Sequence, residues 1–266
     1  AHRVKPPEGM ANWRVATTLA PVRVNADGFG VYQADNYLAL IDHPVEMADF
    51  AEVAFEAGQT PHRLVITGRQ RADLKRLAND LSSICAAAIR FWGDDQPPFA
   101  NYLFQVLAVG SGYGGLEHRS STSLLCSRDD LPLATEPATR INDKYKTFLG
   151  LCSHEYFHAW LVKCIRPEPM LQPDLEREVY LPLLWVFEGL TSYYDDLMLY
   201  RAGLISRQAY LRLLEEQITR HWQTPGHRVQ SLAESGLDAW IKYYRPDENS
   251  PNATTIPPNA TNSDHT

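Results

Sequence analysis

The chain has 266 residues, of which 44% are hydrophobic and 21% charged, and its formal net charge is −7. This length and composition are typical of a globular protein with one large domain or two small ones. The acidic balance and the lack of a basic stripe argue against a nucleic-acid partner, and no apolar run approaches the ~20 residues that cross a bilayer.

The cysteines are too few and too scattered for a disulfide framework or a four-cysteine zinc site, so we interpret them as reduced, mostly buried thiols. They are Cys85, Cys126, Cys152 and Cys164. Residues 1–7 have no apolar core of the kind that a secretory signal needs, although the chain does not begin with Met. The sequence therefore leaves both the cytoplasm and the periplasm open as compartments, and it carries no signal for the oligomeric state.

Short strands and turns are predicted up to about Pro44, because residues 13–19 alternate and Asn25-Ala-Asp-Gly is typical of a turn. Two strands joined by a turn at Gly58 follow, and then an amphipathic helix. After a Pro-Pro pair come an apolar strand broken only by Gln105, a glycine-rich stretch and a further strand. These expected elements cover 50–55, 62–67, 71–92, 102–109, 110–115 and 122–126.

From Asn142 onward the apolar residues recur at helical spacing. We expect helices over about 144–162, 183–201 and 206–221, with a weaker candidate near 237–244. The second half of the chain is therefore predicted to be mainly helical.

The residues that carry chemistry gather in 153–158, Ser-His-Glu-Tyr-Phe-His. Two histidines four apart on a helix differ by only about 40° around its axis, so the rings of His154 and His158 face one point, as two ligands of a tetrahedral zinc site do. Glu155 lies about 100° further round, beside the metal, where it can take a proton from bound water. Because this pattern also arises by chance, a third ligand is needed to support it.

Glu188 offers that third ligand, since a catalytic zinc site needs three protein ligands and an open position. It is the one acidic residue in the apolar run Leu-Leu-Trp-Val-Phe-Glu-Gly-Leu. A buried carboxylate needs a partner, which a metal ion or a buried arginine would supply. We favour the metal because of the histidine pair.

Residues that orient the histidines are expected on the helix that carries Glu188, because ligating histidines usually donate their other N–H to a carboxylate or carbonyl. Asp195 lies seven residues after Glu188, and Ser192 lies four residues after it. Asp195 is the preferred partner and Ser192 the second candidate. The alternative for Asp195 is a capping or surface role.

These motifs resemble those of the glycyl aminopeptidase family of gluzincin zinc peptidases, whose full-length members usually carry a PDZ domain. The similarity lies in 153–160, SHEYFHAW, and in 184–194, LWVFEGLTSYY, and it extends from about Trp13 to Asn252. It implies a thermolysin-like α+β fold, in which a mixed sheet and helix precede an all-helical part. Residues 1–43 would be a remnant of a preceding β-domain, 44–245 the zinc peptidase catalytic domain with a shortened helical part, and 246–266 a disordered tail rich in Pro, Asn, Thr and Ser.

The resemblance also implies one zinc ion per chain, with His154, His158 and Glu188 as its ligands and Glu155 as the catalytic acid and base. Related aminopeptidases carry a Gly-x-Met-Glu-Asn strand whose glutamate holds the α-amine of the substrate. Gly114-Gly115-Leu116-Glu117-His118 stands at that place here, so Glu117 would bind the amine and the two glycines would lie beside the peptide. From the residues alone, this stretch is a glycine-rich turn with a solvated glutamate.

Two departures from the family pattern stand out. Leu161 and Cys164 occur where the family has Asn and Arg in Trp-Asn-Val-Lys-Arg-Ile-Arg-Pro. The tyrosine that donates to the developing oxyanion in the family lies beyond the position of Asn252, where this chain continues as Thr-Thr-Ile-Pro-Pro-Asn-Ala after one alanine. The chain therefore resembles a fragment or a chain with an aberrant end, expected to bind zinc and to hydrolyse peptides slowly.

The function implied is that of a zinc-dependent aminopeptidase. It would hydrolyse N-terminal Gly or Ala from peptides with a free N-terminus, with Glu155 activating a zinc-bound water. Two alternatives remain open. One is a catalytically silent module that binds zinc and peptides; the other is a zinc endopeptidase, which would not need Glu117.

Overall fold

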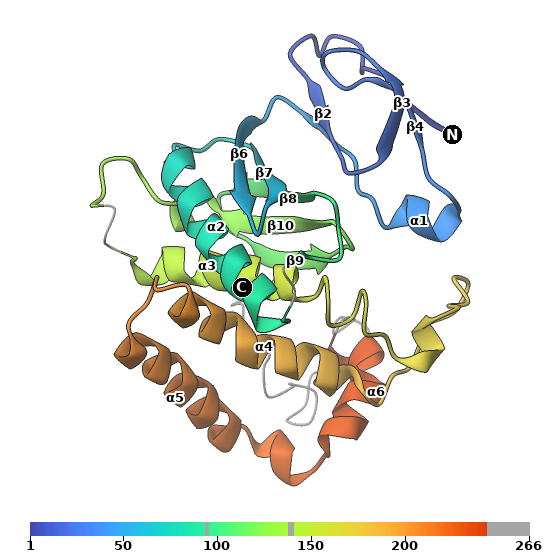
Figure 1. Cartoon of the computed structure of the whole chain (residues 1–266). Coiled ribbons are helices and arrows are strands. Elements are labelled where there is room, and N and C mark those ends of the chain that lie inside the picture. The colour runs from blue at the N-terminus through green and yellow to red at the C-terminus, as the bar shows by residue number, and fades with distance from the viewer. Residues whose placement is uncertain (94–95, 138–140, 244–266) are drawn as a thin grey trace.

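The computed structural model describes residues 1–93, 96–137 and 141–243 (Figure 1). The first part of the chain forms two small β elements. A three-stranded antiparallel sheet has the order β1-β4-β3, and the side chain of Asn25 accepts hydrogen bonds from the amides of Asp27 and Phe29 in its expected turn. The second element is a ribbon in which β2 pairs with β5. The bounds are β1 (His2–Val4), β2 (Arg14–Ala16), β3 (Ala20–Val24), β4 (Gly30–Gln33), α1 (Tyr37–Ile41) and β5 (Glu46–Ala48).

A five-stranded mixed sheet forms the centre of the molecule, in the order β6-β7-β8-β10-β9. β7, β8 and β10 run parallel, whereas β6 and β9 pair antiparallel to their neighbours at the two edges. The glycine-rich stretch therefore ends in an edge strand, β9. The bounds are β6 (Ala51–Ala57), β7 (Thr60–Thr67), β8 (Tyr102–Val109), β9 (Tyr113–Glu117) and β10 (Ser121–Ser127).

Both faces of this sheet are covered. Side chains alternate between the two faces of a strand, so Leu64 and Phe104 belong to the main core, which includes residues of α2 (Leu74–Phe91) and α3 (Asp143–Phe157). On the other face, Val65 and Leu103 pack with Ala16, Ala48 and Phe50 of the β2–β5 ribbon and its surroundings. β8 is buried on both faces, which explains why its sequence is almost continuously apolar.

Gln105 is the polar exception in β8, and its partners explain it. Its Nε2 donates to the carbonyl oxygen of Ala16 over 2.9 Å, and its Oε1 accepts from the hydroxyl of Ser123 over 3.4 Å. A buried amide that finds partners in this way does not oppose folding. It also ties the β2–β5 ribbon to the central sheet.

The second half of the chain is mainly helical, as predicted, and α4, α5 and α6 lie together on the far side of α3 from the sheet (Figure 1). Capping side chains begin several of these helices, among them Asp73 at α2, Asn142 at α3 and Ser206 at α5. The remaining bounds are η1 (Arg128–Asp130), η2 (Glu168–Met170), α4 (Leu184–Arg201), α5 (Arg207–Gln223), η3 (Pro225–Arg228) and α6 (Leu232–Lys242).

Two helices differ from the sequence prediction. α3 ends at Phe157 rather than near 162, because the amides of Ala159 and Trp160 donate to carbonyl oxygens three residues back instead of four, which breaks the helical pattern. α6 begins at Leu232, earlier than expected, because Ser231 and Glu234 form a capping box. The overall α+β class, with a mixed sheet and helix before a helical part, is confirmed.

Two further expectations can be compared with the structure. Cys85, Cys126 and Cys152 are buried, whereas Cys164 is exposed. In the described ranges, no helix combines the length and the apolar character that a membrane span requires. The tail expected to be disordered, 246–266, lies outside the described residues.

Candidate active site

Two histidine rings meet at the end of α3. His154 lies in its last turn and His158 follows as the C-terminal capping residue, so the helical spacing carries over to both side chains. Their Nε2 atoms are 3.1 Å apart, and the two ring planes are nearly perpendicular, at 84°. The pair therefore presents two nitrogens to one small volume.

Glu188 completes this arrangement from the second turn of α4. Its Oε2 is 3.4 Å from Nε2 of His154 and 3.6 Å from Nε2 of His158. Within the described ranges, these residues are the one group of three or more His, Cys, Asp or Glu side chains whose ligand atoms all lie close enough to share an ion, here within 4.8 Å. Two imidazoles and a carboxylate are a donor set that suits zinc.

The outer nitrogen of each ring is occupied. Nδ1 of His154 is 3.0 Å from Oδ2 of Asp195, and Nδ1 of His158 is 2.8 Å from the carbonyl oxygen of Leu161. A carbonyl only accepts, so Nδ1 of His158 donates, and Nε2 is the nitrogen that faces the site. The hydroxyl of Ser153 donates to the carbonyl oxygen of Asp195 over 2.9 Å and links α3 to α4. Metal-ligating histidines are usually oriented in this manner.

Ser192, the second candidate for that role, makes no hydrogen bond to either histidine among the described residues. The neighbouring Thr191 places its Oγ1 3.5 Å from Nδ1 of His158 and donates to the carbonyl oxygen of Phe187 over 2.6 Å. Thr191 is fully buried, whereas Ser192 is half-buried. The helical spacing correctly predicted that Asp195 contacts His154. It did not predict that the hydroxyl near His158 belongs to Thr191 and not to Ser192.

The charges of the three converging side chains compensate one another. Burial opposes ionisation of Glu188, yet hydrogen bonds from His154 and His158 hold its pKa below the usual range. Burial likewise opposes protonation of His154, but hydrogen bonds to Asp195 and Glu188 raise its pKa. The site therefore stabilises positive charge at the centre of the three residues.

Glu155 points from α3 toward β9. Its Oε2 is buried and has no hydrogen-bond partner among the described residues, and burial raises the pKa of this carboxyl to about 7, against the opposing effect of His154 and His158. A Cβ atom added to Gly115 would overlap the carboxylate of Glu155. A partnerless buried carboxylate oxygen beside the three converging residues is what a proton acceptor for water requires.

β9 brings Glu117 to the same face. Residues two apart on a strand point to one face, and the Cβ direction of Gly115 points at Glu155, so Glu117 shares the face that Glu155 covers. The Glu117 side chain is 24% exposed, and its negative charge also raises the pKa of Glu155. Around Gly114, a Cβ would meet no atom within 4 Å. The edge strand thus offers a carboxylate and open backbone side by side.

An ion cluster that the sequence did not reveal surrounds Glu117. The ammonium of Lys163 is 3.2 Å from Oδ1 of Asp42 and 3.8 Å from Oε1 of Glu117. Asp42 also accepts from the amide of Arg119 over 3.2 Å and lies 3.5 Å from Nδ1 of His118. Asp42 and Lys163 are 121 positions apart, so no local pattern could have found the contact.

The departures at Leu161 and Cys164 have different surroundings. Leu161 is buried in a cluster with Phe157 and Phe187, and its backbone, rather than a side-chain amide, accepts the hydrogen bond from His158. Cys164 is exposed. Tyr243 is the residue that follows α6. Burial and the carboxylate of Glu188 raise the pKa of its phenol, so the phenol stays protonated at neutral pH. The chain beyond Tyr243 lies outside the described residues.

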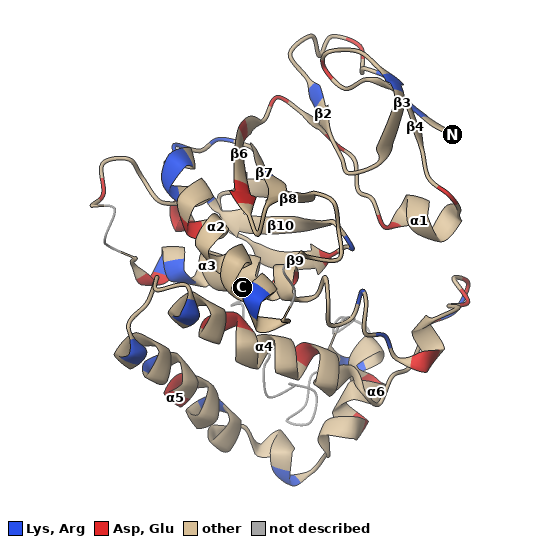
Figure 2. Ribbon diagram, in the orientation of Figure 1, with Lys and Arg blue, Asp and Glu red and all other residues tan. Residues whose placement is uncertain are grey.

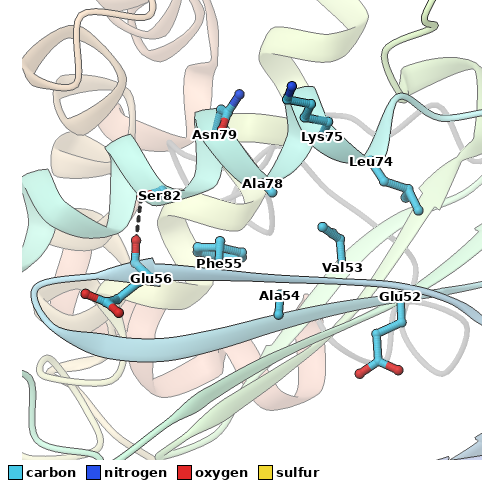
Figure 3. Close-up of a pocket in the computed structure, with 10 residues that line it drawn as sticks. All are labelled: Glu52, Val53, Ala54, Phe55, Glu56, Leu74, Lys75, Ala78, Asn79 and Ser82. Atoms are coloured by element: carbon cyan, nitrogen blue, oxygen red, sulfur yellow. Dashed lines mark hydrogen bonds between the residues drawn. The ribbon is translucent and has the colours of Figure 1, made fainter.

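Charged residues of both signs are scattered over the strands and helices (Figure 2). A pocket of about 540 Å³ lies between β6 and α2, lined by residues such as Glu52, Phe55 and Lys75 (Figure 3). It is at the opposite edge of the central sheet from β9 and contains none of the predicted site residues. The converging residues of α3, α4 and β9 therefore remain the candidate site.

Comparisons with known proteins show which family the chain resembles. A family model described as M61 glycyl aminopeptidase matches residues 147–256, and one described as Peptidase M61 N-terminal domain matches residues 2–49. A crystal structure of an aminopeptidase N family protein from Idiomarina loihiensis is similar, with a TM-score of 0.88 and 42% identity over 95% of this chain. The chain spans 43% of the length of that relative. No curated protein matches the chain in sequence.

A second solved structure, of a two-domain M1 zinc metallopeptidase mutant bound to L-tryptophan, is more distant. It has 14% identity and a TM-score of 0.46, and the match covers 80% of this chain and 42% of that one. At this level of similarity it carries no weight here. The family of this chain is shown by the two family models and by the similarity to the Idiomarina structure.

Proposed function

Because the chain belongs to the M61 glycyl aminopeptidase family of peptidases, we propose that it is a zinc-dependent aminopeptidase. Its substrates would be peptides with a free N-terminus, from which it removes small first residues, Gly or Ala. The observation that carries the proposal is the convergence of His154, His158 and Glu188 beside the buried Glu155, whose Oε2 has no hydrogen-bond partner among the described residues. The preference for glycine rests on the description of the family.

One zinc ion per chain fits the three converging side chains. His158 directs its Nε2 at the site, His154 is oriented by Asp195, and Glu188 supplies the anionic ligand. Zinc bound there would act as a Lewis acid, polarising the scissile carbonyl and making water acidic enough to attack near neutral pH. His154 belongs to α3 and Glu188 to α4, so metal binding would also join these two helices.

Glu155 would act as the acid and base of the reaction. Its carboxylate accepts a proton from the attacking water and then returns it to the nitrogen of the leaving amine. Burial raises the pKa of this carboxyl above its usual range, which favours a group that accepts a proton and then returns it. Burial at 5% exposure keeps competing water away from it.

Glu117 would recognise the substrate amine. An α-ammonium placed at this carboxylate would form a charge-assisted hydrogen bond, and a peptide that starts there can add to the free edge of β9 in extended form. Gly114 and Gly115 leave room for the peptide backbone along this edge. Release of single residues from the N-terminus would follow, because the amine and the cleaved bond are held at fixed places.

Three outcomes separate this function from its alternatives. Zinc per chain is measured by mass spectrometry, and cleavage is measured on a glycyl or alanyl tripeptide and on its N-acetylated form. The proposal expects one zinc per chain, release of the free first residue and no cleavage of the acetylated peptide. Cleavage of both peptides would indicate an endopeptidase, and zinc binding with no cleavage would indicate a silent binding module. Glu155→Gln serves as the control that keeps zinc and loses about 10²–10⁴-fold in rate.

A further inference from the structure

The ammonium of Lys163 lies between two carboxylates with different roles. It is 3.2 Å from Oδ1 of Asp42, as a hydrogen-bonded pair, and 3.8 Å from Oε1 of Glu117, as a looser ion pair. The three side chains are 18%, 14% and 24% exposed, so solvent screens their charges only in part. The cation is therefore shared between an acid of the N-terminal part and the carboxylate on β9.

The place of Lys163 is fixed by the metal-site helix. Its amide donates to the carbonyl oxygen of His158 over 3.0 Å, and its own carbonyl oxygen accepts from Nε of Arg166 over 2.9 Å. The backbone of Lys163 is thus hydrogen-bonded to the second histidine of the site. Its side chain extends toward Glu117 from a fixed backbone position.

Asp42 is held as firmly as Lys163. It is the capping residue after α1, and its Oδ2 accepts from the backbone amide of Arg119, which follows β9 by two residues. Nδ1 of His118 lies 3.5 Å from its Oδ1. Burial raises the pKa of this carboxyl, but the hydrogen bonds from His118, Lys163 and Arg119 outweigh burial and hold it at about 2. Asp42 is therefore ionised at any pH at which a peptidase of this kind would work.

These contacts have a consequence for substrate binding, given the proposed role of Glu117. An incoming ammonium needs the same carboxylate that Lys163 contacts, and two cations on one carboxylate repel each other. We infer that Lys163 is a built-in competitor for the amine site and that Asp42 is the positioning residue that draws it off Glu117, so that the substrate ammonium can bind. The inference rests on the proposed function, in which Glu117 is the amine anchor.

The test is a double-mutant cycle on Asp42 and Lys163, with the full chain loaded with zinc. Asp42→Asn keeps the shape of the side chain and removes the charge that holds Lys163, so KM for an alanyl tripeptide should rise about tenfold while kcat stays within about twofold. In the Lys163→Met background there is no competitor to position, so the same Asp42→Asn change should alter KM by less than about twofold. Non-additivity of this kind is the mark of a direct coupling between two groups.

A second measurement does not depend on turnover. Calorimetry on metal-stripped protein measures the dissociation constant of the dipeptide Ala-Ala and of N-acetyl-Ala-Ala. Asp42→Asn should weaken Ala-Ala binding about tenfold and leave the acetylated peptide unchanged. Glu52→Gln is the matched control: Glu52 also pairs with the N-terminal part, through Arg14 at 2.8 Å, but at the far edge of the sheet. It should leave both dissociation constants unchanged.

The outcomes separate this inference from the proposed function. Glu117→Gln should abolish discrimination between free and acetylated peptides; failure to do so would remove the amine anchor and the inference with it. A clear effect of Glu117→Gln, together with an unchanged KM in Asp42→Asn, would overturn the inference alone. An equal effect of Asp42→Asn in both backgrounds would also overturn it, because Asp42 would then act as a simple charge or as a structural contact.

Discussion

The carboxylate of Glu155 lies so close to Gly115 that a side chain at position 115 would overlap it unless Glu155 moved. Glu155 belongs to α3 and Gly115 to β9, two elements that are separated in the sequence. Their contact therefore sets the distance between the helix with the histidine pair and the edge strand with Glu117. A glycine is required here for close approach and not for an unusual backbone angle, since the positive-φ glycines lie elsewhere.

Gly115→Ala should therefore displace the Glu155 side chain. Because a shift of about 1 Å in a reacting group can reduce a rate about 10²-fold, we expect a loss of about that size in kcat, with the zinc content retained. Steady-state kinetics and metal analysis on the same preparation check this. Gly110→Ala, in the same glycine-rich stretch, is the control, because its nearest neighbour would be the end of the flexible Arg128 side chain at 4.0 Å. Normal rates in Gly115→Ala would contradict the role of this contact.

Glu188→Ala should abolish stoichiometric zinc binding, because the site keeps only two imidazole ligands. A metal that binds the folded state stabilises it by about 4 kcal/mol at 1,000 times its dissociation constant. We therefore expect wild-type protein to unfold at a clearly lower temperature in the presence of a chelator, and the variant to show no such difference. Glu215→Ala, at an exposed position of α5, should behave as wild type. Full zinc retention in Glu188→Ala would rule out the assignment of this ligand.

Asp195→Asn should weaken zinc binding about 10–100-fold without abolishing it, the effect usual for a carboxylate that orients a ligating histidine. The neighbouring carboxylate gives a matched control: Asp196 accepts from Nε2 of Gln217 over 3.2 Å, whereas Asp195 contacts His154. Competition with a chromophoric chelator measures both affinities. Equal losses in Asp195→Asn and Asp196→Asn would indicate a general charge effect instead of orientation of His154.

The buried His62 should make the fold sensitive to acid. Its Nδ1 donates to the carbonyl oxygen of Thr60 and its Nε2 accepts from the hydroxyl of Tyr156, so the ring is neutral. Burial lowers its pKa from 6.5 to about 4. The unfolded chain then takes up the proton first as the pH falls, so the stability present above pH 6.5 is lost on the way to pH 4.

For this one group we expect a loss of about 2 kcal/mol in the free energy of unfolding between pH 7.5 and pH 5. Urea unfolding of metal-stripped protein at the two pH values measures it. His62→Gln, which cannot titrate, should lose that much less stability than wild type over the same range, whereas His2→Gln at an exposed position should show the wild-type slope. Parallel behaviour of His62→Gln and wild type would show that His62 is already charged in the folded chain or does not contribute.

Local patterns in the sequence were enough to predict much of this molecule. The apolar run over 102–109 has the same bounds as β8, because a strand buried on both faces is marked by its composition alone. The spacing of His154 and His158 places their rings together because one helix carries both. Asp195 follows Glu188 by two turns of one helix, α4, and this spacing placed it on the face from which it contacts His154 of α3.

Other features depend on contacts between distant segments, and these could not be predicted. The end of α3 at Phe157 follows from backbone hydrogen bonds in the next turn, which have no signature in side-chain periodicity. The pairing of Asp42 with Lys163 joins residues 121 positions apart. The need for glycine at position 115 follows from a neighbour on another element. Each of these requires knowledge of how elements pack, which a single sequence does not contain.

The position of Glu117 and Gly115 on one strand has a consequence for where a substrate would be cut. They are two residues apart on β9, a distance of about 6.8 Å, and Glu155 lies against the second of them. A peptide that starts at Glu117 and runs antiparallel to β9 advances by about 3.8 Å between successive α-carbons, so its first peptide bond arrives between these two positions. The spacing of Glu117 and Gly115 on the strand would then determine which peptide bond of the substrate lies beside Glu155. A substrate whose first residue is β-alanine, with one more backbone carbon, would carry its first bond further along the strand and should be cleaved more slowly than an alanyl peptide, although its amine would be held just as well.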